Sequence, residues 1–584
     1  MILQALVKLY EDLRSRGEID AEGWSKVKIG YAVCIDKSGA VTQVIPQVKE
    51  EQRGKKTVQA PLQIMLPAPI TKTVGIKSNF LWENAEYLLG LPKDAENEEQ
   101  AADNKAKSAK RFDACRQKHH ELLDGVDSDA AKAVLAFFDS WDNSNAAEHP
   151  LIVPIADALR KGVNLTFRFN GRYVSDDPAI QKAWDEHYSK STGEQMQCLV
   201  TGEYGPYEPI HPKIKGVNGA QSSGASIVSF NAPAFCSYDK EQNANAPVGK
   251  YASFAYTAAL NHLLADKNYV QHIGDTTVVF WADGAEPQYR ALSLAALFGN
   301  SESSGFTDEQ LQSAVARLAK GLPVKELDVE ADRTFYILGL SPNASRLSVR
   351  FFLKGSFGSF MKNVNDHHER MRIDRPSFDK FETVPLWKLL SETVNQNSRD
   401  KSASPILSGA VARAIFSGGP YPASLIESVM IRIRAEHDVS RIKAAIIKAY
   451  YLKNQNQGCP KEVLTVSLNE SSTNTAYNLG RLFSVYEAVQ QKANPGINST
   501  IRDKYFSSAA ATPATIFPVL DNLCQKHLRK IDEGSRVYYG RQIGDIKNRF
   551  GEELPLRLSL PQQGSFNLGY YHQTQKRFTK KEEN

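Results

Sequence analysis

The sequence predicts an α+β protein of several domains, with a mixed N-terminal α/β portion followed by an all-α C-terminal helical bundle. At about 150 residues per domain, 584 residues correspond to roughly four domains. Strand and helix patterns mix as far as about residue 355, without the steady alternation of a doubly wound sheet. From about residue 380 the pattern is helical. We therefore expect an α+β region over 1–230, a second over 231–380, a helical connector over 381–460 and a basic helical bundle over 461–584.

The N-terminal elements follow from hydrophobic periodicity. Residues 1–13 form an amphipathic helix, and the charges on its outer face exclude a signal peptide. Apolar and polar residues alternate over 26–36 and 40–47. The two runs flank a turn at Asp36-Lys37-Ser38-Gly39, and the pattern predicts a β-hairpin. A third extended run covers 58–66.

Further strands are predicted downstream. Asn170-Gly171, flanked by extended runs, is a strong signal for a two-residue hairpin turn. Five other runs also predict strands: 197–201, 225–230, 276–281, 334–340 and 347–353.

Three C-terminal helices are indicated by apolar stripes and end signals. One covers about 475–491 and stops before Asn494-Pro495-Gly496. Another follows Thr512, with Pro513 at its first position, where a missing N–H costs nothing. The last covers about 562–578.

The charge is unevenly distributed. Residues 401–584 carry 25 basic and 15 acidic side chains, whereas the whole chain has a net charge of only +5. A concentrated positive region attracts polyanions through released counterions. A merely solvated helical surface is the alternative explanation.

Cysteine usage and hydropathy indicate the compartment. The six cysteines include no Cys-x-x-Cys pair, so neither a disulfide scaffold nor a zinc module is supported. No run of about 18 apolar residues occurs, so we expect no membrane span. We expect a cytoplasmic protein.

Signatures of catalysis are scarce. The sequence has no Gly-x4-Gly-Lys-Ser/Thr loop, no Gly-x-Gly-x-x-Gly after a strand and no Gly-x-Ser-x-Gly elbow. We expect no catalytic residues, no bound metal and no cofactor. The alternative is a metal-dependent nuclease, because carboxylates and imidazoles can hold a divalent ion that activates water. Its candidate ligands are Asp366, His367, His368, His437 and Asp438.

The first candidate contact segment is 70–79. We expect a helix over 80–89, capped by Ser78 or Asn79, whose free N–H groups form an anion site with Lys72 and Lys77. An Asn side chain can also pair with the edge of adenine. An ordinary capped helix with two surface lysines is the alternative.

The second candidate is the segment 211–224. Lys213 and Lys215 precede a loop of small residues in which Gln221 and Ser222 are the polar side chains of interest. Such a loop lets the backbone approach a polyanion and presents Gln221 as a polar probe. A flexible turn before a strand explains the pattern equally well.

Nine short stretches and one tyrosine stand out as a set: GIKSNFLWEN at 75–84, KGV at 215–217, SSG at 222–224, SFN at 229–231, Tyr238, NAP at 245–247, LGLSPN at 338–343, RLSVR at 346–350, NSTIRDKYF at 498–506 and LGYYHQ at 568–573. Together they resemble the signature stretches of one family, the large subunits of type I-C CRISPR Cascade. They occur in order along nearly the whole chain.

The resemblance implies a non-enzymatic subunit of an RNA-guided surveillance complex. Guide pairing would read the target, while this chain would recognise a short motif in the adjacent duplex (the PAM), help to open the strands and stabilise the R-loop. The implied partners are CRISPR RNA, double-stranded target DNA, the other backbone and small subunits of Cascade, and a separate helicase-nuclease. The duplex contacts would come from Lys72, Gly75, Lys77, Ser78, Asn79, Lys213, Lys215, Gln221, Ser222 and Asn231.

The C-terminal bundle resembles a Cascade small subunit, which lies along nucleic acid. We expect its cations to contact phosphates regardless of sequence. They are Arg502, Lys504, Lys526, Arg529, Lys530, Arg536, Arg541, Lys547 and Arg549. Four aromatic side chains could stack on unpaired bases, although core positions are the more usual explanation: Tyr505, Phe506, Tyr570 and Tyr571.

Overall fold

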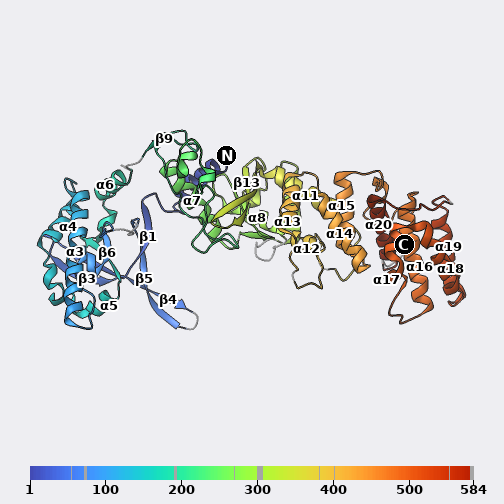
Figure 1. Ribbon diagram of the computed structural model, residues 1–584, viewed down its shortest axis with the longest axis horizontal. Coiled ribbons are helices and arrows are strands. Elements are labelled where there is room, and N and C mark those ends of the chain that lie inside the picture. Colours follow the sequence, from blue (N-terminus) through green and yellow to red (C-terminus); the bar gives the residue numbers. More distant parts are fainter. Residues whose placement is uncertain are drawn as a thin grey trace. The chain divides into compact units, whose positions relative to one another are not determined.

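The computed structural model describes residues 1–53, 56–70, 75–189, 194–268, 270–298, 307–379, 382–399, 401–551 and 553–578. Strands and helices mix in the N-terminal part, and helices follow one another in the C-terminal part (Figure 1). The predicted α+β class is confirmed. The chain forms two compact units: residues 1, 3–211 and 230–259 make the first, and residues 2, 212–229 and 260–584 make the second.

The first unit contains a mixed sheet in the order β3-β2-β7-β6, with β8 paired to β7. Its strands are β2 (Tyr31–Ile35), β3 (Val41–Pro46), β6 (Trp82–Asn84), β7 (Asn164–Phe169) and β8 (Arg172–Tyr173). The β2–β3 hairpin was predicted, but the parallel pairing of β2 with β7 joins segments too far apart for periodicity to reveal. Asn170 and Gly171 have φ of 47° and 79°, so the predicted two-residue turn between β7 and β8 is confirmed.

A second sheet has the order β1-β5-β4, built from β1 (Trp24–Ile29), β5 (Lys56–Pro67) and β4 (Val48–Arg53). The run 26–36, predicted as one strand, is therefore two strands in two sheets. The division falls at Gly30, where a side chain would overlap Val163. β1 pairs instead with β5, which contains the predicted run 58–66.

Helices pack around the mixed sheet: α2 (Ala85–Leu88), α3 (Glu98–Leu123), α4 (Asp129–Ser140), α5 (Ala156–Arg160) and α6 (Pro178–Ser189). Aromatic side chains of α4 and β7 form the centre of the core, where Phe137 and Phe167 lie edge to face with ring centroids 5.1 Å apart. This core supports the short strand β6, which follows the first candidate contact segment.

The first unit also contains α1 (Ile2–Ser15), β9 (Gln195–Gln197), β10 (Tyr204–Pro206) and the start of α7 (Lys250–Ala265). The predicted N-terminal helix is confirmed, and its Tyr10 packs edge to face against Tyr251 and Phe254. The run 197–201 was predicted as a strand, but β9 ends at Gln197 and residues 199–201 form a turn.

In the second unit, β11 (Gln271–Ile273), β12 (Thr276–Ala282), β13 (Thr334–Asn343) and β14 (Arg346–Ser356) form an antiparallel sheet in chain order. The strands predicted at 276–281, 334–340 and 347–353 are confirmed. The strand predicted at 225–230 is wrong, because Ala225 and Ser226 form only isolated bridges, with Ile214 and Arg346.

Helices pack against this sheet and continue beyond it: α8 (Pro287–Phe298), α10 (Asp308–Ala319), α11 (Phe357–Met371), α12 (Leu386–Ser391), α13 (Pro405–Ser417), α14 (Ala423–Glu436), α15 (Arg441–Asn454), α16 (Thr475–Ala493), α17 (Ile501–Ala511), α18 (Pro513–Leu528), α19 (Glu533–Lys547) and α20 (Leu560–Lys576). The predicted helices 475–491 and 562–578 correspond to α16 and α20. The helix predicted after Thr512 is α18.

α16 and α20 form the centre of the C-terminal helices, which are drawn together in Figure 1. They approach most closely at two glycines. A side chain at Gly480 would overlap the carbonyl oxygen of Phe566, and one at Gly569 would overlap that of Tyr477. The remaining helices of the bundle expose their outer faces.

Candidate nucleic-acid interface

The first candidate segment lies in the first unit, immediately before β6. Gly75, Ile76 and Lys77 are exposed, whereas Ser78 and Asn79 are buried. Lys72 lies outside the described residues. Among the described residues of the segment, Lys77 is an exposed cation, and Gly75 has a φ of 73°, a conformation that few other residues adopt readily.

The helix expected directly after Asn79 is not there. β6 occupies residues 82–84, and α2 begins only at Ala85, where the side chain of Asn84 accepts a hydrogen bond from the N–H of Glu86. The predicted cap at Ser78 or Asn79 is therefore wrong, and so is the anion site at that helix start. The helix does not start there because residues 82–84 pair with the distant strand β7 instead.

The buried polar atoms of Ser78 and Asn79 make hydrogen bonds inside the protein. The Ser78 hydroxyl donates to the Asn79 carbonyl at 2.8 Å, and the Asn79 side-chain oxygen accepts from the N–H of Ile70 at 3.0 Å. Contact with DNA through either residue stays a prediction. These two hydrogen bonds hold the backbone that directly follows Lys77 in place.

Three buried side chains hold the residues that follow. Glu83 accepts hydrogen bonds from the N–H groups of Asn79 (3.0 Å) and Asn84 (3.2 Å). His119 of α3 accepts from the N–H of Leu81 (3.0 Å), and Thr166 of β7 donates to the Leu81 carbonyl (2.8 Å). Sequence analysis missed this support because α3 and β7 lie 38 and 85 residues from Leu81, and no local pattern connects them.

Residues 212–224 of the second candidate segment lie in the second unit, and several hydrogen bonds anchor them. The N–H of Lys215 donates to the side chain of Asn261 at 2.8 Å, and that side chain donates to the Lys213 carbonyl at 3.1 Å. The Lys213 ammonium group donates to the hydroxyl of Ser226 at 2.9 Å. These bonds favour a positioned loop over a flexible turn.

The tip of this loop is open to solvent. Lys215, Gln221 and Ser222 are exposed, while Gly224 is buried with φ of 97° and would bring a side chain against Lys213. Gln221 is thus exposed, as a polar probe would require, and its contact with DNA stays a prediction. Asn231 is also exposed, but it belongs to the first unit.

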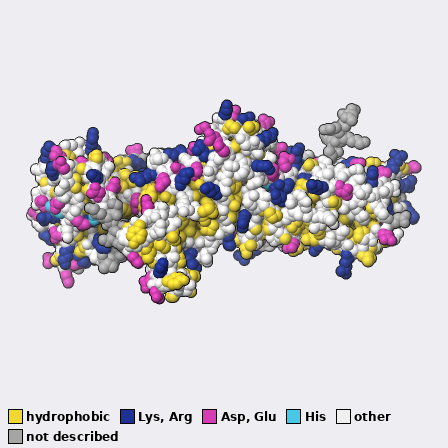
Figure 2. Space-filling model, turned by 90° about the horizontal axis from the view of Figure 1, so that it is seen from above, with side chains coloured by type: hydrophobic (Ala, Val, Ile, Leu, Met, Phe, Trp, Pro, Cys, Tyr) yellow, Lys and Arg dark blue, Asp and Glu magenta, His cyan; other side chains and the backbone are white. Residues whose placement is uncertain are grey.

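The predicted phosphate contacts of the bundle divide into two groups. Arg502 lies 3.5 Å from Asp438 and 3.8 Å from the buried Glu487, and Lys547 lies 2.9 Å from Asp521. Lys547 is exposed despite this ion pair, and the other seven are exposed as well: Lys504, Lys526, Arg529, Lys530, Arg536, Arg541 and Arg549. On the face drawn in Figure 2, basic side chains are spread over the right-hand end rather than gathered in one cluster.

The aromatic side chains proposed to stack on bases are largely core residues. Phe506, Tyr570 and Tyr571 are buried, and the rings of Phe506 and Tyr570 meet edge to face at 5.0 Å. The Tyr570 hydroxyl donates to Glu487 at 2.6 Å. Tyr505 is only partly buried, and the Lys504 ammonium lies 5.1 Å from its ring centroid.

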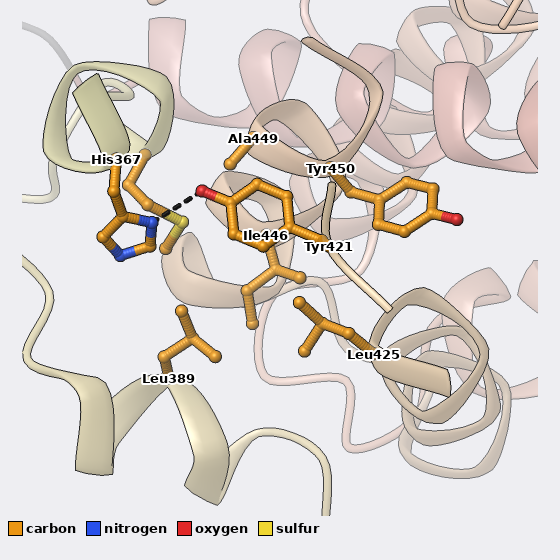
Figure 3. A pocket seen from close by; sticks show the side chains of 8 residues that line it. His367, Leu389, Tyr421, Leu425, Ile446, Ala449 and Tyr450 are labelled. Atoms are coloured by element: carbon orange, nitrogen blue, oxygen red, sulfur yellow. Dashed lines mark hydrogen bonds between the residues drawn. The ribbon is translucent and has the colours of Figure 1, made fainter. Parts of the chain in front are cut away.

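Four of the five candidate metal ligands contact other groups, and one of them is Asp438, which pairs with Arg502. His367 is buried and its Nδ1 lies 2.7 Å from the hydroxyl of Tyr421, in a pocket whose side chains leave no room for a water molecule (Figure 3). Burial lowers the pKa of His367 well below its ordinary value. Asp366 pairs with Lys362, and His368 Nε2 lies 3.2 Å from the carbonyl of Ala296.

The described residues contain no group of three or more His, Cys, Asp or Glu side chains arranged to hold a metal ion. The arrangement gives no support to the metal-dependent nuclease.

In the same described ranges, no helix has both the length and the apolar character needed to span a bilayer.

A comparison with models of protein families shows which family the chain belongs to. Residues 6–578 match one family model, described as CRISPR-associated protein (Cas_Csd1). The chain belongs to this CRISPR-associated family. No curated protein shows significant similarity to it.

The Cas_Csd1 match confirms the family resemblance drawn from the signature stretches. In the structure some of these residues are buried and others are exposed. LGYYHQ at 568–573 lies in α20 and is entirely buried, so it builds the core. Segments 75–77 and 222–223 are exposed, so their side chains can meet a partner of this Cas_Csd1 chain.

Proposed function

We propose that the chain is the large subunit of a cytoplasmic, RNA-guided type I-C Cascade, and that it carries out no catalysis itself. It recognises the PAM in double-stranded target DNA, assists strand opening, stabilises the R-loop and recruits a separate helicase-nuclease. Its partners are CRISPR RNA and the backbone and small subunits. The observation that carries the proposal is the Cas_Csd1 match over residues 6–578.

The exposed contact segments support the DNA-binding part of the proposal. Lys77 extends from a backbone that buried hydrogen bonds hold in place, and Gly75 leaves room for a close approach. Lysine can contact the edge of guanine in the major groove, or a phosphate of the DNA backbone. We therefore assign duplex contact to Lys77 and support of strand separation to the exposed Gln221.

The exposed cations of α18 and α19 support contact with the nucleic-acid backbone. Such contacts are independent of sequence and become weaker as salt is added. They suit a displaced strand or a guide–target duplex, whose sequence changes with every target.

The test compares duplexes with an intact and a scrambled PAM, using the complex assembled with CRISPR RNA. We expect wild type to prefer the intact PAM, and Lys77→Ala to reduce that preference by about 1–3 kcal/mol, the size of a lost base contact. Lys182→Ala, which removes an exposed lysine from α6, is the matched control and should bind as wild type does.

Equal affinity of wild type for both duplexes would contradict PAM recognition. If Lys77→Ala kept the full preference, the contact would have to be assigned to other residues. Cleavage of DNA by the purified complex with Mg²⁺, in the absence of any helicase-nuclease, would contradict the non-catalytic assignment.

A further inference from the structure

Leu81 has an unusual backbone conformation. Its φ of 64° lies in the left-handed region, where a bulky side chain is disfavoured, and its side chain is fully buried. Such a conformation persists only where the surrounding structure enforces it, and it often accompanies a functional segment. Leu81 lies four residues after the exposed Lys77.

Both backbone polar groups of Leu81 are held by side chains from other elements. Its N–H donates to His119 Nε2 at 3.0 Å, and its carbonyl accepts from the hydroxyl of Thr166 at 2.8 Å. Since α3 and β7 belong to the core of the first unit, these two bonds attach the strained residue to that core.

His119 is suited to accept this hydrogen bond. Its Nδ1 lies 2.8 Å from the Cys115 carbonyl, so the ring proton is on Nδ1 and the lone pair of Nε2 faces Leu81. Burial lowers the pKa of His119 to about 4, which keeps the ring neutral near pH 7. The rings of Phe80 and Phe138 pack against the His119 ring, with centroid distances of 5.2 and 4.6 Å.

Glu83 transmits this constraint towards the exposed segment. One carboxylate oxygen accepts from the N–H of Asn79 and the other from the N–H of Asn84, which closes residues 79–84 into a fixed loop. Asn79 in turn holds the N–H of Ile70. These hydrogen bonds therefore fix the direction in which the backbone runs from the core towards Lys77.

We propose that His119 is a positioning residue for PAM recognition, acting through Leu81 to set the direction in which residues 75–77 meet duplex DNA. This inference rests on the proposed function. A purely structural histidine would contribute to stability alone, whereas a positioning residue also sets the preference for the PAM.

The test uses variants that lose or keep an acceptor for the Leu81 N–H. His119→Leu fills the buried site with an apolar side chain and removes this acceptor, together with the donor to the Cys115 carbonyl. His119→Gln keeps a side-chain acceptor and a side-chain donor. In the assembled complex, we expect His119→Leu to lower the ratio of affinities for intact and scrambled PAM by roughly tenfold, the effect of a misplaced base contact. His119→Gln should recover most of the ratio.

Val134→Ala is the matched control, because Val134 is buried in the same core and its aliphatic side chain makes no hydrogen bond to residues 78–84. It should lower the melting temperature and leave the ratio unchanged. If His119→Leu does not assemble, Thr166→Val removes the other bond to Leu81 in a side chain of nearly the same shape, and the same tenfold loss is expected.

The outcomes separate this inference from the proposed function. A wild-type complex that binds both duplexes equally contradicts the proposed function. A wild type that prefers the PAM, together with an assembled variant of His119 or Thr166 that keeps the full preference, overturns the inference alone. A ratio that falls equally in Val134→Ala also overturns it.

Discussion

Lys526 lies in the last turn of α18, and Arg529 and Lys530 follow directly after that helix, so the three cations are close together along the chain. All three are exposed. Arg502, in contrast, is paired with Asp438 and the buried Glu487, and that pairing competes with any phosphate. The strongest candidates for backbone contact are thus the cations at the end of α18.

Reversing two of these charges should change the salt dependence of target binding. Each phosphate contact contributes about −0.9 to the log–log slope on duplex DNA and about −0.7 on a single strand, so Arg529→Glu with Lys530→Glu should flatten the slope by about 1.4 to 1.8. Affinity measured between 50 and 200 mM salt gives the slope.

The matched control is Lys320→Glu with Lys325→Glu, which makes the same change in charge at two exposed lysines outside the bundle. Its slope should equal that of wild type. An unchanged slope in the Arg529 and Lys530 variant would show that these side chains face only water.

Individual site residues could be predicted from sequence only where the signal is local. The exposure of Gln221 follows from the glycines around it, and the structure shows that side chain exposed. The burial of Asn79 could not be foreseen, because its partners are the backbone of Ile70 and the carboxylate of Glu83 in the folded loop. Whether these residues contact DNA stays a prediction.

Among elements, those with their own turn or cap signals were predictable and those defined by distant pairing were not. The hairpin at Asn170-Gly171 and the helix α16 carry their signals within a few residues. Residues 80–89 have helical composition, yet pairing of 82–84 with β7 makes their first part a strand. Tertiary context outweighs propensity there.

The crossing of α16 and α20 gives a sharp test of packing. Gly480→Ala places a methyl group against the Phe566 carbonyl, and backbone cannot move as a flexible side chain does. We expect the free energy of unfolding to fall by about 2–3 kcal/mol, the upper part of the range for overpacking. Urea unfolding followed by circular dichroism measures it.

Gly544→Ala is the control within α19. A side chain there meets nothing within 4 Å, so the higher helix propensity of alanine should raise stability by about 0.5–1 kcal/mol. If Gly480→Ala were as stable as wild type, the two helices would not pack as closely as described.

For the whole molecule, buried neutral histidines link stability to pH. His119, His211 and His572 are buried, and burial lowers their pKa values from 6.5 to about 4, about 4 and about 3. Below pH 6.5 the unfolded chain therefore binds more protons than the folded chain. The free energy of unfolding falls as pH falls from 6.5 towards 4.

We expect each of these histidines to lower the free energy of unfolding by about 1–2 kcal/mol between pH 7 and pH 5. His572→Gln should lose correspondingly less stability over this interval than wild type, whereas His272→Gln, at an exposed position, should follow wild type. Urea unfolding at pH 7, 6 and 5 supplies the comparison. Identical losses in all three proteins would contradict the burial of an uncharged His572.

The parallel neighbour of β2 lies more than a hundred residues further along the chain. During synthesis, the ribosome must deliver residue 169 before that neighbour exists. Until then, the nascent β2–β3 hairpin has an open edge that another chain can join, and this is a known route to aggregation. Production of soluble protein should therefore depend on keeping newly made N-terminal segments apart, through slow expression or a bound chaperone.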